Sequence, residues 1–381
     1  MSDFATWFGL KADRDDFHVQ TKRDFALFFA RSSIDATIRR SIDEANRGRN
    51  PLKMVLFGDW GCGKTHTLRH LEYLLENTSV PKGFPVFIDL PDVMAKTRFN
   101  EAQSLLLDAI GFEKVREWVR QYNAKHSNAG QLIRDFTSSA DVEKALLTLL
   151  GYGDSAQIAW EWLRGQALNA NESRAVGLPP SLTQSHALVS VLRVLGIMCR
   201  EFEERMLTFL VDEADNLRNV TDHDSINHWR QCLRSLSDVD NEECGVVIAG
   251  GFNDTEDMPA MLSDEQIVTR FGQSHYVSLQ TFQRDEAIEF LRCLFEEWID
   301  DAKRNALISS HSSEADGEQL QAATFPFTAE ALSKFCEYCC RTGGVTRPRD
   351  IQTDLHAVLN HAIDGSRHVL STVFLNTVIG S

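Results

Sequence analysis

The chain has 381 residues, which is long enough for one large core or for two to three domains, and its 43% hydrophobic and 25% charged residues are typical of a folded globular protein. Its 55 acidic residues outnumber its 39 basic ones, and the net charge of −16 argues against a protein that coats nucleic acid with its general surface. No apolar run reaches the roughly 18 residues of a membrane span, no signal-peptide pattern opens the chain, and the cysteines are scattered as reduced thiols are, so we expect a cytoplasmic protein without a membrane partner.

The first part of the chain predicts helical structure ahead of the first strand. Residues 24–30 form a short apolar segment, and residues 34–42 have the spacing of an amphipathic helix that Ser33 would cap. Two interpretations of this part stay open. It packs near a nucleotide bound to the loop that follows, or it is an ordinary packing helix.

A glycine-rich segment between a strand and a helix predicts a phosphate-binding loop. Residues 54–57 are an apolar run typical of a buried strand, and residues 67–75 have apolar side chains at helical spacing. Between them, residues 58–65 follow the pattern G-x-x-x-x-G-K-[ST], in which backbone N–H groups surround a β-phosphate at a helix N-terminus. We expect Lys64 at the β- and γ-phosphates and Thr65 at Mg²⁺. The residues expected at the nucleotide are Gly58, Asp59, Trp60, Gly61, Cys62, Gly63, Lys64, Thr65 and His66.

A long helical tract follows the second strand, which residues 85–90 predict. Most of residues 92–180 have helical spacing, which indicates a helical subdomain inserted at a surface loop. Within it, residues 114–134 carry five Lys and Arg against one Glu, with a tryptophan and a tyrosine between them. This stretch has two interpretations: a contact with nucleic-acid phosphates and bases, or a solvated helix face with a buried tryptophan.

A strand that ends in two carboxylates predicts the second part of the same site. Residues 207–211 indicate a buried strand, and Asp212 and Glu213 follow at its carboxyl end, where ligands of open α/β sheets bind. We expect Asp212 to hold Mg²⁺, directly or through water, and Glu213 to polarise the attacking water. Such a strand is common on its own, but downstream of a phosphate-binding loop it is specific.

The remaining pattern completes an α/β fold. Further strands are predicted at 244–251 and 275–279, further helices at 185–204, 280–298, 329–338 and 351–363, and a polar mobile loop at 309–323. We therefore expect the parallel five-stranded sheet of a P-loop NTPase, flanked by helices, with a helical insertion and a C-terminal helical lid. The expected domains are an N-terminal helical segment near the nucleotide at 1–50, the α/β core at 51–279 with its insertion at about 92–180, and the lid and tail at 280–381.

The order of these motifs resembles that of the AAA+ ATPases, in the branch of initiators and transposition regulators. The resemblance covers roughly residues 28–363, and its specific parts are the Walker A motif at 58–65 and the Walker B motif at 207–213. It implies that Asn253, just past the fourth strand, orients the lytic water. It also implies that Arg270, before the last strand, is an arginine finger offered to a neighbouring subunit.

The same resemblance implies a sensor arginine in the lid. Two arginines follow a glycine pair at 343–344, and either Arg347 or Arg349 matches the residue that reports the γ-phosphate to the lid, with Arg347 slightly favoured. The long insertion, with the sequence W-E-W-L-R-G at 160–165, is similar in addition to ATP-binding proteins of bacterial phage-defence islands.

The resemblance implies an ATPase that binds ATP and Mg²⁺ and releases ADP and phosphate. We expect it to form a homo-oligomer through its nucleotide sites and to act as a switch or motor for a DNA-acting protein partner, with DNA contacted directly or through that partner. Phage defence and transposition-like DNA transactions are the settings that this implies. The alternative is a signalling or scaffold module that hydrolyses ATP slowly and contacts no nucleic acid. An intact Glu213 favours hydrolysis, and the Asp-Glu pair disfavours a small-molecule kinase.

Overall fold

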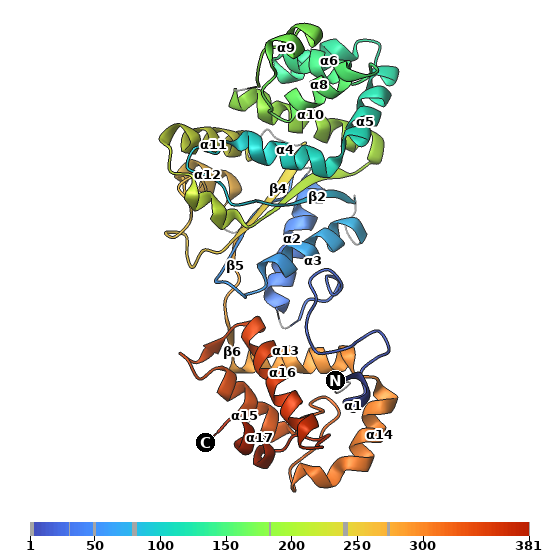
Figure 1. The fold of residues 1–381 in the computed structure, drawn as a ribbon, viewed down its shortest axis with the longest axis vertical. Helices are drawn as coiled ribbons and strands as arrows, with labels where there is room; N and C mark the ends of the chain where they lie inside the picture. The colour runs from blue at the N-terminus through green and yellow to red at the C-terminus, as the bar shows by residue number, and fades with distance from the viewer. Residues whose placement is uncertain are drawn as a thin grey trace. The chain divides into compact units, whose positions relative to one another are not determined.

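The computed structural model describes residues 4–29, 31–48, 51–77, 82–182, 184–238, 243–272 and 275–380. Residues 1–3, 30, 49 and 50 of the predicted N-terminal segment, and residue 381 at the end of the predicted tail, lie outside these ranges. The chain forms two compact units (Figure 1). The sheet unit consists of Ala36–Gly58 and Thr67–Ser278, and the helical unit consists of Met1–Asp35, Asp59–His66 and Leu279–Ser381.

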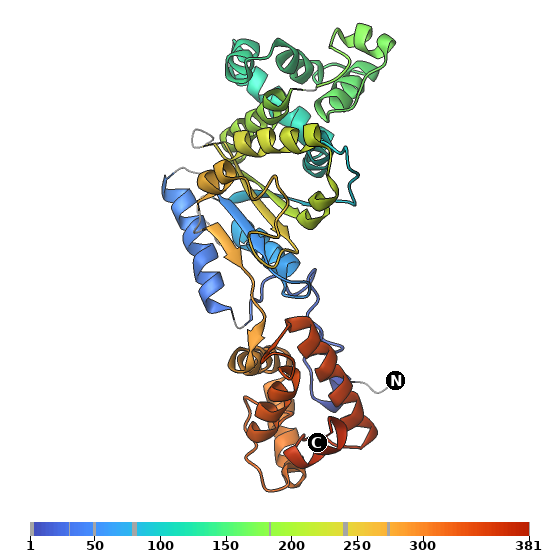
Figure 2. The ribbon, with the colours of Figure 1, turned by 90° about the vertical axis from the view of Figure 1, so that its left-hand side faces the viewer.

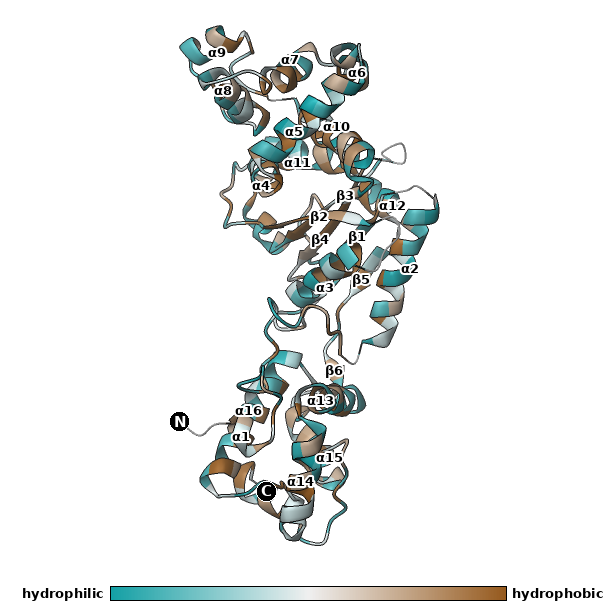
Figure 3. Cartoon of the chain, turned by 90° about the vertical axis from the view of Figure 1, so that its right-hand side faces the viewer, coloured by the Kyte–Doolittle hydropathy of each residue, from teal (hydrophilic) through white to brown (hydrophobic). Residues whose placement is uncertain are grey.

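The sheet unit is built on five parallel strands in the order β2-β3-β4-β1-β5. The strands are β1 (Lys53–Phe57), β2 (Gly83–Asp89), β3 (Met206–Asp212), β4 (Cys244–Gly250) and β5 (Tyr276–Ser278). Every residue of β3 and β4 is buried, which suits a parallel sheet covered on both faces, and Figure 3 shows these strands as hydrophobic. The predicted five-stranded parallel sheet is confirmed.

Helices cover both faces of this sheet. On one face, Arg69 of α3 (Lys64–Asn77) lies over the ring of Phe87 in β2. Val86, the residue before Phe87, points to the other face of the sheet because side chains alternate along a strand. Phe209 of β3 pairs in register with Val86 and therefore also points to that face, where α4 (Phe99–Ile110) and α11 (His223–Leu236) pack. Figure 2 shows α2 (Ser32–Gly48) alongside β5, the strand at one edge of the sheet.

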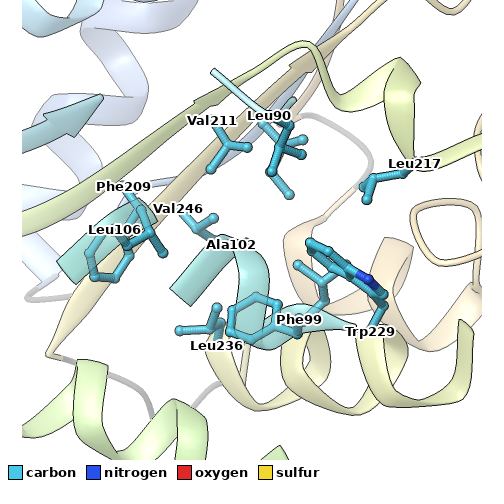
Figure 4. A pocket seen from close by; sticks show the side chains of 12 residues that line it. Leu90, Phe99, Ala102, Leu106, Phe209, Val211, Leu217, Trp229, Leu236 and Val246 are labelled. Carbon is cyan, nitrogen blue, oxygen red and sulfur yellow. The ribbon is translucent and has the colours of Figure 1, made fainter. Parts of the chain in front are cut away.

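A small cavity lies between the sheet and the helices α4 and α11 (Figure 4). Its volume is about 20 Å³, and its lining side chains are all hydrophobic. The one polar atom among those side chains, Nε1 of Trp229, donates a hydrogen bond to the carbonyl oxygen of Thr97 at 3.1 Å. A cavity with this lining offers a water molecule no partner, so it is a gap in the packing and not a polar ligand site.

The tract between β2 and β3 is helical. After α4 it contains α5 (Phe112–Lys125), α6 (Ala129–Thr137), α7 (Ala140–Thr148), α8 (Asp154–Leu163), α9 (Ala170–Val176) and α10 (Ser185–Glu203). Figure 1 shows α6, α8 and α9 stacked beyond α10. The sequence pattern did not predict α9, a short helix that Asn169 begins with a capping box to Glu172.

Two lysines of the basic stretch at 114–134 are paired with acidic side chains of α10. Nζ of Lys114 lies 2.7 Å from Oε1 of Glu203, and Nε1 of Trp118 donates to the same oxygen at 3.0 Å. Lys125 makes a similar ion pair with Glu201 at 2.7 Å. The full burial of Trp118 supports the interpretation of this stretch as a helix face with a buried tryptophan.

The helical unit combines the C-terminal helices with the start of the chain. Its elements are α1 (Phe4–Trp7), α13 (Arg284–Trp298), α14 (Asp301–His311), α15 (Ala329–Cys339), α16 (Pro348–Asp364), α17 (Thr372–Val378) and an antiparallel pair, β6 (Phe282–Gln283) with β7 (Val345–Thr346). Phe8 and Phe17 belong to its hydrophobic core, and the ring of Trp7 stacks on His368 at 4.3 Å. Helix α13 begins four residues later than predicted because residues 282–283 pair with β7.

The first part of the predicted mobile loop at 309–323 is helical, whereas residues 316–323 are turns and irregular backbone. Helix α14 continues to His311, and a 3-10 helix, η3 (Ser312–Ala315), follows it directly. The carboxylate of Glu314 accepts the backbone N–H groups of His368 and Val369 at 2.7 and 3.0 Å. The Glu314 side chain of this segment therefore binds neighbouring backbone groups, which composition alone does not reveal.

Among the described residues, no helix combines the length and the apolar composition that a membrane span requires.

Candidate nucleotide-binding site

The glycine-rich loop, residues 58–65, leaves β1 and turns directly into α3. Gly61 and Gly63 have φ angles of 82° and 89°, a region that residues with a side chain rarely adopt. At Gly63 an added Cβ would meet no atom within 4 Å, so the backbone conformation, and not a lack of space, requires glycine there. The first turn of α3 begins at Lys64, and its N-terminal N–H groups form the kind of site that binds phosphate.

Asp59 organises the inside of this loop. Its carbonyl oxygen accepts a hydrogen bond from Nζ of Lys64 at 3.0 Å and another from the backbone N–H of Cys62 at 3.3 Å. Its carboxylate Oδ1 accepts the backbone N–H of Trp60 at 2.7 Å. Thr65 is half-buried in the first turn of α3, and Nε2 of His66 lies 2.6 Å from the carbonyl oxygen of Leu27.

Both candidate sensor arginines contact the loop. Arg347 is the residue before Pro348 at the start of α16, and its Nη2 lies 2.7 Å from Oδ2 of Asp59. The guanidinium of Arg349 lies over the ring of Trp60, with its carbon 4.0 Å from the ring centroid. The sequence left the choice between the two arginines open, and in the structure each contacts a different residue of the loop.

The sequence did not single out Arg31, which also contacts the loop. The residue is only 8% exposed, and its Nη2 donates 2.9 Å hydrogen bonds to the carbonyl oxygens of Cys62 and Gln280. No local pattern marks Arg31, because its partners are distant in the chain. Burial raises the pKa of the Cys62 thiol, although the charges of Arg31 and Lys64 oppose that shift, so this cysteine is not a reactive thiol.

Asp212 and Glu213 stand at the carboxyl end of β3. Asp212 is 2% exposed, and its Oδ1 accepts the backbone N–H of Glu213 at 2.9 Å. Glu213 is exposed and has a φ of 57°, in the left-handed region that is uncommon outside glycine. Unlike the helix-end residues Ser138 and Glu204, which share this conformation, Glu213 follows a strand. Strain of this kind is often found at functional sites.

Two residues of the 3-10 helix η1 (Ala214–Asn219), to which the sequence analysis assigned no role, connect neighbouring strand ends. Oδ1 of Asp215 accepts the backbone N–H of Gly251, just after β4, at 2.9 Å. Nδ2 of Asn216 donates to the carbonyl oxygen of Leu90, just after β2, at 2.8 Å. In the sequence, these two residues are marked only by being polar neighbours shortly after the Asp-Glu motif.

The two remaining predicted residues lie elsewhere in the sheet unit. Asn253 is exposed, and its backbone N–H and side-chain Nδ2 lie 3.2 and 3.4 Å from Oδ2 of Asp257. Arg270 is half-buried near the end of α12 (Glu265–Phe271), where its Nη1 donates to the carbonyl oxygen of Gln266 at 3.2 Å.

The expected magnesium ligands have suitable chemistry. The hydroxyl of Thr65 and the carboxylate of Asp212 are the hard oxygen donors that Mg²⁺ prefers. A carboxylate that is only 2% exposed is costly unless hydrogen bonds or a cation compensate its charge. Each of the two residues thus has the donor chemistry that the ion requires, and their joint role stays a prediction.

No family model matches the sequence, and no curated protein is similar to it. Among solved structures, the ORC2 protein of Aeropyrum pernix in its ADPNP-ADP complexes is similar over 97% of this chain and 72% of that one, with a TM-score of 0.54 and 12% identity. The likeness to Cdc6p of Pyrobaculum aerophilum extends over 96% of this chain and 67% of that one, with a TM-score of 0.46 and 11% identity. The first likeness extends over nearly the whole chain. The chain therefore has the fold of the Aeropyrum pernix protein, which is the fold that the AAA+ resemblance predicted from the sequence.

Proposed function

We propose that this protein binds ATP with Mg²⁺ and hydrolyses it to ADP and phosphate. The observation that carries the proposal is the glycine-rich loop, which passes from β1 to α3 with the positive φ angles of Gly61 and Gly63. Backbone N–H groups of such a loop bind the β-phosphate, and Lys64 neutralises charge on the β- and γ-phosphates. The ADPNP-ADP complexes of the similar Aeropyrum pernix protein support a nucleotide as the ligand.

The carboxylates at the end of β3 have separate roles in this proposal. Thr65 and Asp212 hold Mg²⁺, which when bound neutralises charge on the phosphate oxygens. Glu213 orients the water and accepts its proton as the water oxygen bonds to the γ-phosphorus. The bond from that phosphorus to the bridging oxygen breaks, and ADP leaves. Because β1 and β3 are parallel strands of one sheet, the loop and both carboxylates begin at the same sheet edge, which supports a common task.

The remaining predicted residues act on the same reaction. Asn253 orients the water, and Arg347 and Arg349 report the state of the phosphates to the helical unit. Arg270 acts on the site of a neighbouring copy, so the active form is a homo-oligomer. Turnover in this assembly switches a DNA-acting protein partner or DNA itself, in phage defence or a transposition-like DNA transaction, as the sequence resemblance suggests.

A steady-state assay of phosphate release, with and without DNA, tests this proposal. The wild-type chain should release phosphate from ATP and Mg²⁺, and Lys64→Ala should release none above background. Stimulation by DNA would support direct action on nucleic acid. A slow rate that DNA does not change would favour the signalling module, and no release by the wild-type chain would refute the ATPase.

A further inference from the structure

One residue of the glycine-rich loop contacts both cations that the proposed nucleotide site requires. The carboxylate of Asp59 lies 2.7 Å from Nη2 of Arg347, and its carbonyl oxygen accepts Nζ of Lys64 at 3.0 Å. The side chain of Asp59 is thus engaged by the lid arginine, and its main chain by the loop lysine. All three residues belong to the helical unit.

The Asp59 carboxylate brings a negative charge to a loop that is proposed to bind a phosphate. Like charges a few ångströms apart repel each other unless a cation compensates one of them. Arg347 supplies that compensation. A guanidinium has five N–H donors in a fixed plane, so it can bind the Asp59 carboxylate with one donor and present the others to a phosphate oxygen.

Trp60 extends the same arrangement to the second arginine. Its ring is 67% exposed and lies under the guanidinium of Arg349, with the guanidinium carbon 4.0 Å from the ring centroid. An added Cβ on Gly61 would lie 3.4 Å from Cβ of Arg349, so the arginine backbone also lies close to the loop. A cation–π contact of this kind favours one position of the guanidinium.

We propose that Asp59 is a positioning residue: it holds Arg347 with its carboxylate and Lys64 with its carbonyl, while Trp60 holds Arg349, so that the cations are in place before a nucleotide binds. This inference rests on the proposed function. Holding a binding group in its bound position reduces the ordering that binding requires. The side chains of Arg347 and Asp59 are 38% and 43% exposed, so the ion pair is screened by salt and its effect is limited to about five-fold.

A double-mutant cycle in kcat/KM for ATP tests this inference. The variants are Asp59→Asn, Arg347→Gln and the double variant, because Asp59→Asn removes the charge and keeps the main-chain contact with Lys64. We expect Asp59→Asn to lower kcat/KM about five-fold at low salt, and the double variant to match Arg347→Gln within about two-fold. Asp59→Glu should restore most of the loss.

The matched control is Asp354→Asn. It disrupts another exposed ion pair of the helical unit, in which Nη1 of Arg341 lies 3.3 Å from Oδ2 of Asp354, and it should leave kcat/KM unchanged. The inference would be overturned if the loss of kcat/KM in the double variant equalled the product of the two single losses. A gain in kcat/KM for Asp59→Asn would also overturn it, because it would mean that the carboxylate repels phosphate. An inactive wild-type chain would instead refute the proposed function.

The stacking of Arg349 on Trp60 can be tested without a nucleotide. All seven tryptophans lie in the described part of the chain, and only Trp60 is exposed. The fluorescence emission of Trp60 is therefore obtained by subtracting the spectrum of Trp60→Phe from that of the wild-type chain. Arg349→Ala should make this emission easier to quench with acrylamide, whereas equal quenching would overturn the role of Trp60.

Discussion

The carboxylate of Asp215 accepts a hydrogen bond from the backbone N–H of Gly251 at 2.9 Å. This bond connects the segment after β3 to the segment after β4, and Asn216 makes the corresponding connection to Leu90 after β2. Three neighbouring strand ends are thereby joined. Glu213 directly precedes η1, the element that supplies both of these hydrogen-bonding side chains.

We expect Asp215→Ala to lower kcat for ATP while leaving the dissociation constant of ATP nearly unchanged. The substitution leaves the N–H of Gly251 without its charged acceptor, and a lost hydrogen bond to a charged group costs about 1.5–3 kcal/mol. Asp215→Asn keeps an acceptor oxygen and is the matched variant. Single-turnover hydrolysis together with equilibrium binding separates the two effects, and an unchanged kcat for Asp215→Ala would show that the connection does not support the reaction.

Glu213→Gln should bind ATP and lose turnover. An amide retains the size of the side chain but cannot accept the proton of the attacking water. The variant should therefore also accumulate any assembly that forms with ATP, which size-exclusion chromatography coupled to light scattering can follow. Hydrolysis at the wild-type rate would assign the reaction to another carboxylate.

Arg270 should act on the site of a neighbouring copy. Its side chain is held only by the Gln266 carbonyl of its own helix, at 3.2 Å, among the contacts of the described residues. An arginine that stabilises charge on a transferring phosphoryl group raises kcat by roughly 10³-fold or more. Arg270→Ala and Glu213→Gln should each be inactive alone and regain activity when mixed, because one copy then supplies the arginine and the other an intact site. No recovery at any mixing ratio would contradict the assignment.

Local patterns were sufficient to predict much of the fold. The apolar run of β1, the glycines at 61 and 63 and the helical spacing of α3 all lie within one short stretch, so the loop could be identified before its structure was known. The Asp-Glu end of β3 is equally local. Its roles, and those of Asn253, Arg270 and the lid arginines, stay predictions.

Contacts between distant segments could not be predicted in the same way. Trp7 packs on His368, and Asp59 pairs with Arg347, because the fold brings segments together that are far apart in the sequence. The segment at 309–323 looked like a solvated loop because its side chains are polar. One of them, the carboxylate of Glu314, accepts the backbone N–H of Val369, a contact that no local pattern reveals.

The stability of the insertion should depend on pH through Glu203. Hydrogen bonds from Lys114 and Trp118 lower the pKa of this carboxyl from its ordinary value of 4.5. A carboxyl with a lowered pKa in the folded state stabilises the protein above its unfolded pKa, and the contribution is lost as the pH falls through the folded pKa.

Glu203→Gln should therefore destabilise the chain at neutral pH by about 1–2 kcal/mol, because it removes a charged hydrogen-bond acceptor, and by less near about pH 3.5. Urea unfolding of both proteins at the two pH values measures the difference. Glu76→Gln, at an exposed position of α3, is the control and should differ from the wild-type chain equally at both. The same destabilisation by Glu203→Gln at both pH values would contradict the role of this carboxylate.

Calorimetric titration of ATP and Mg²⁺ into the wild-type chain and into Lys64→Ala tests the central claim most directly. Lys64 begins α3 inside the glycine-rich loop, and its ammonium is the cation expected at the β- and γ-phosphates. We predict saturable binding of one nucleotide per wild-type chain and no measurable binding to Lys64→Ala at the same concentrations. Binding of ATP to Lys64→Ala with wild-type affinity, or no binding to either protein, would contradict the assignment of this loop as the nucleotide site.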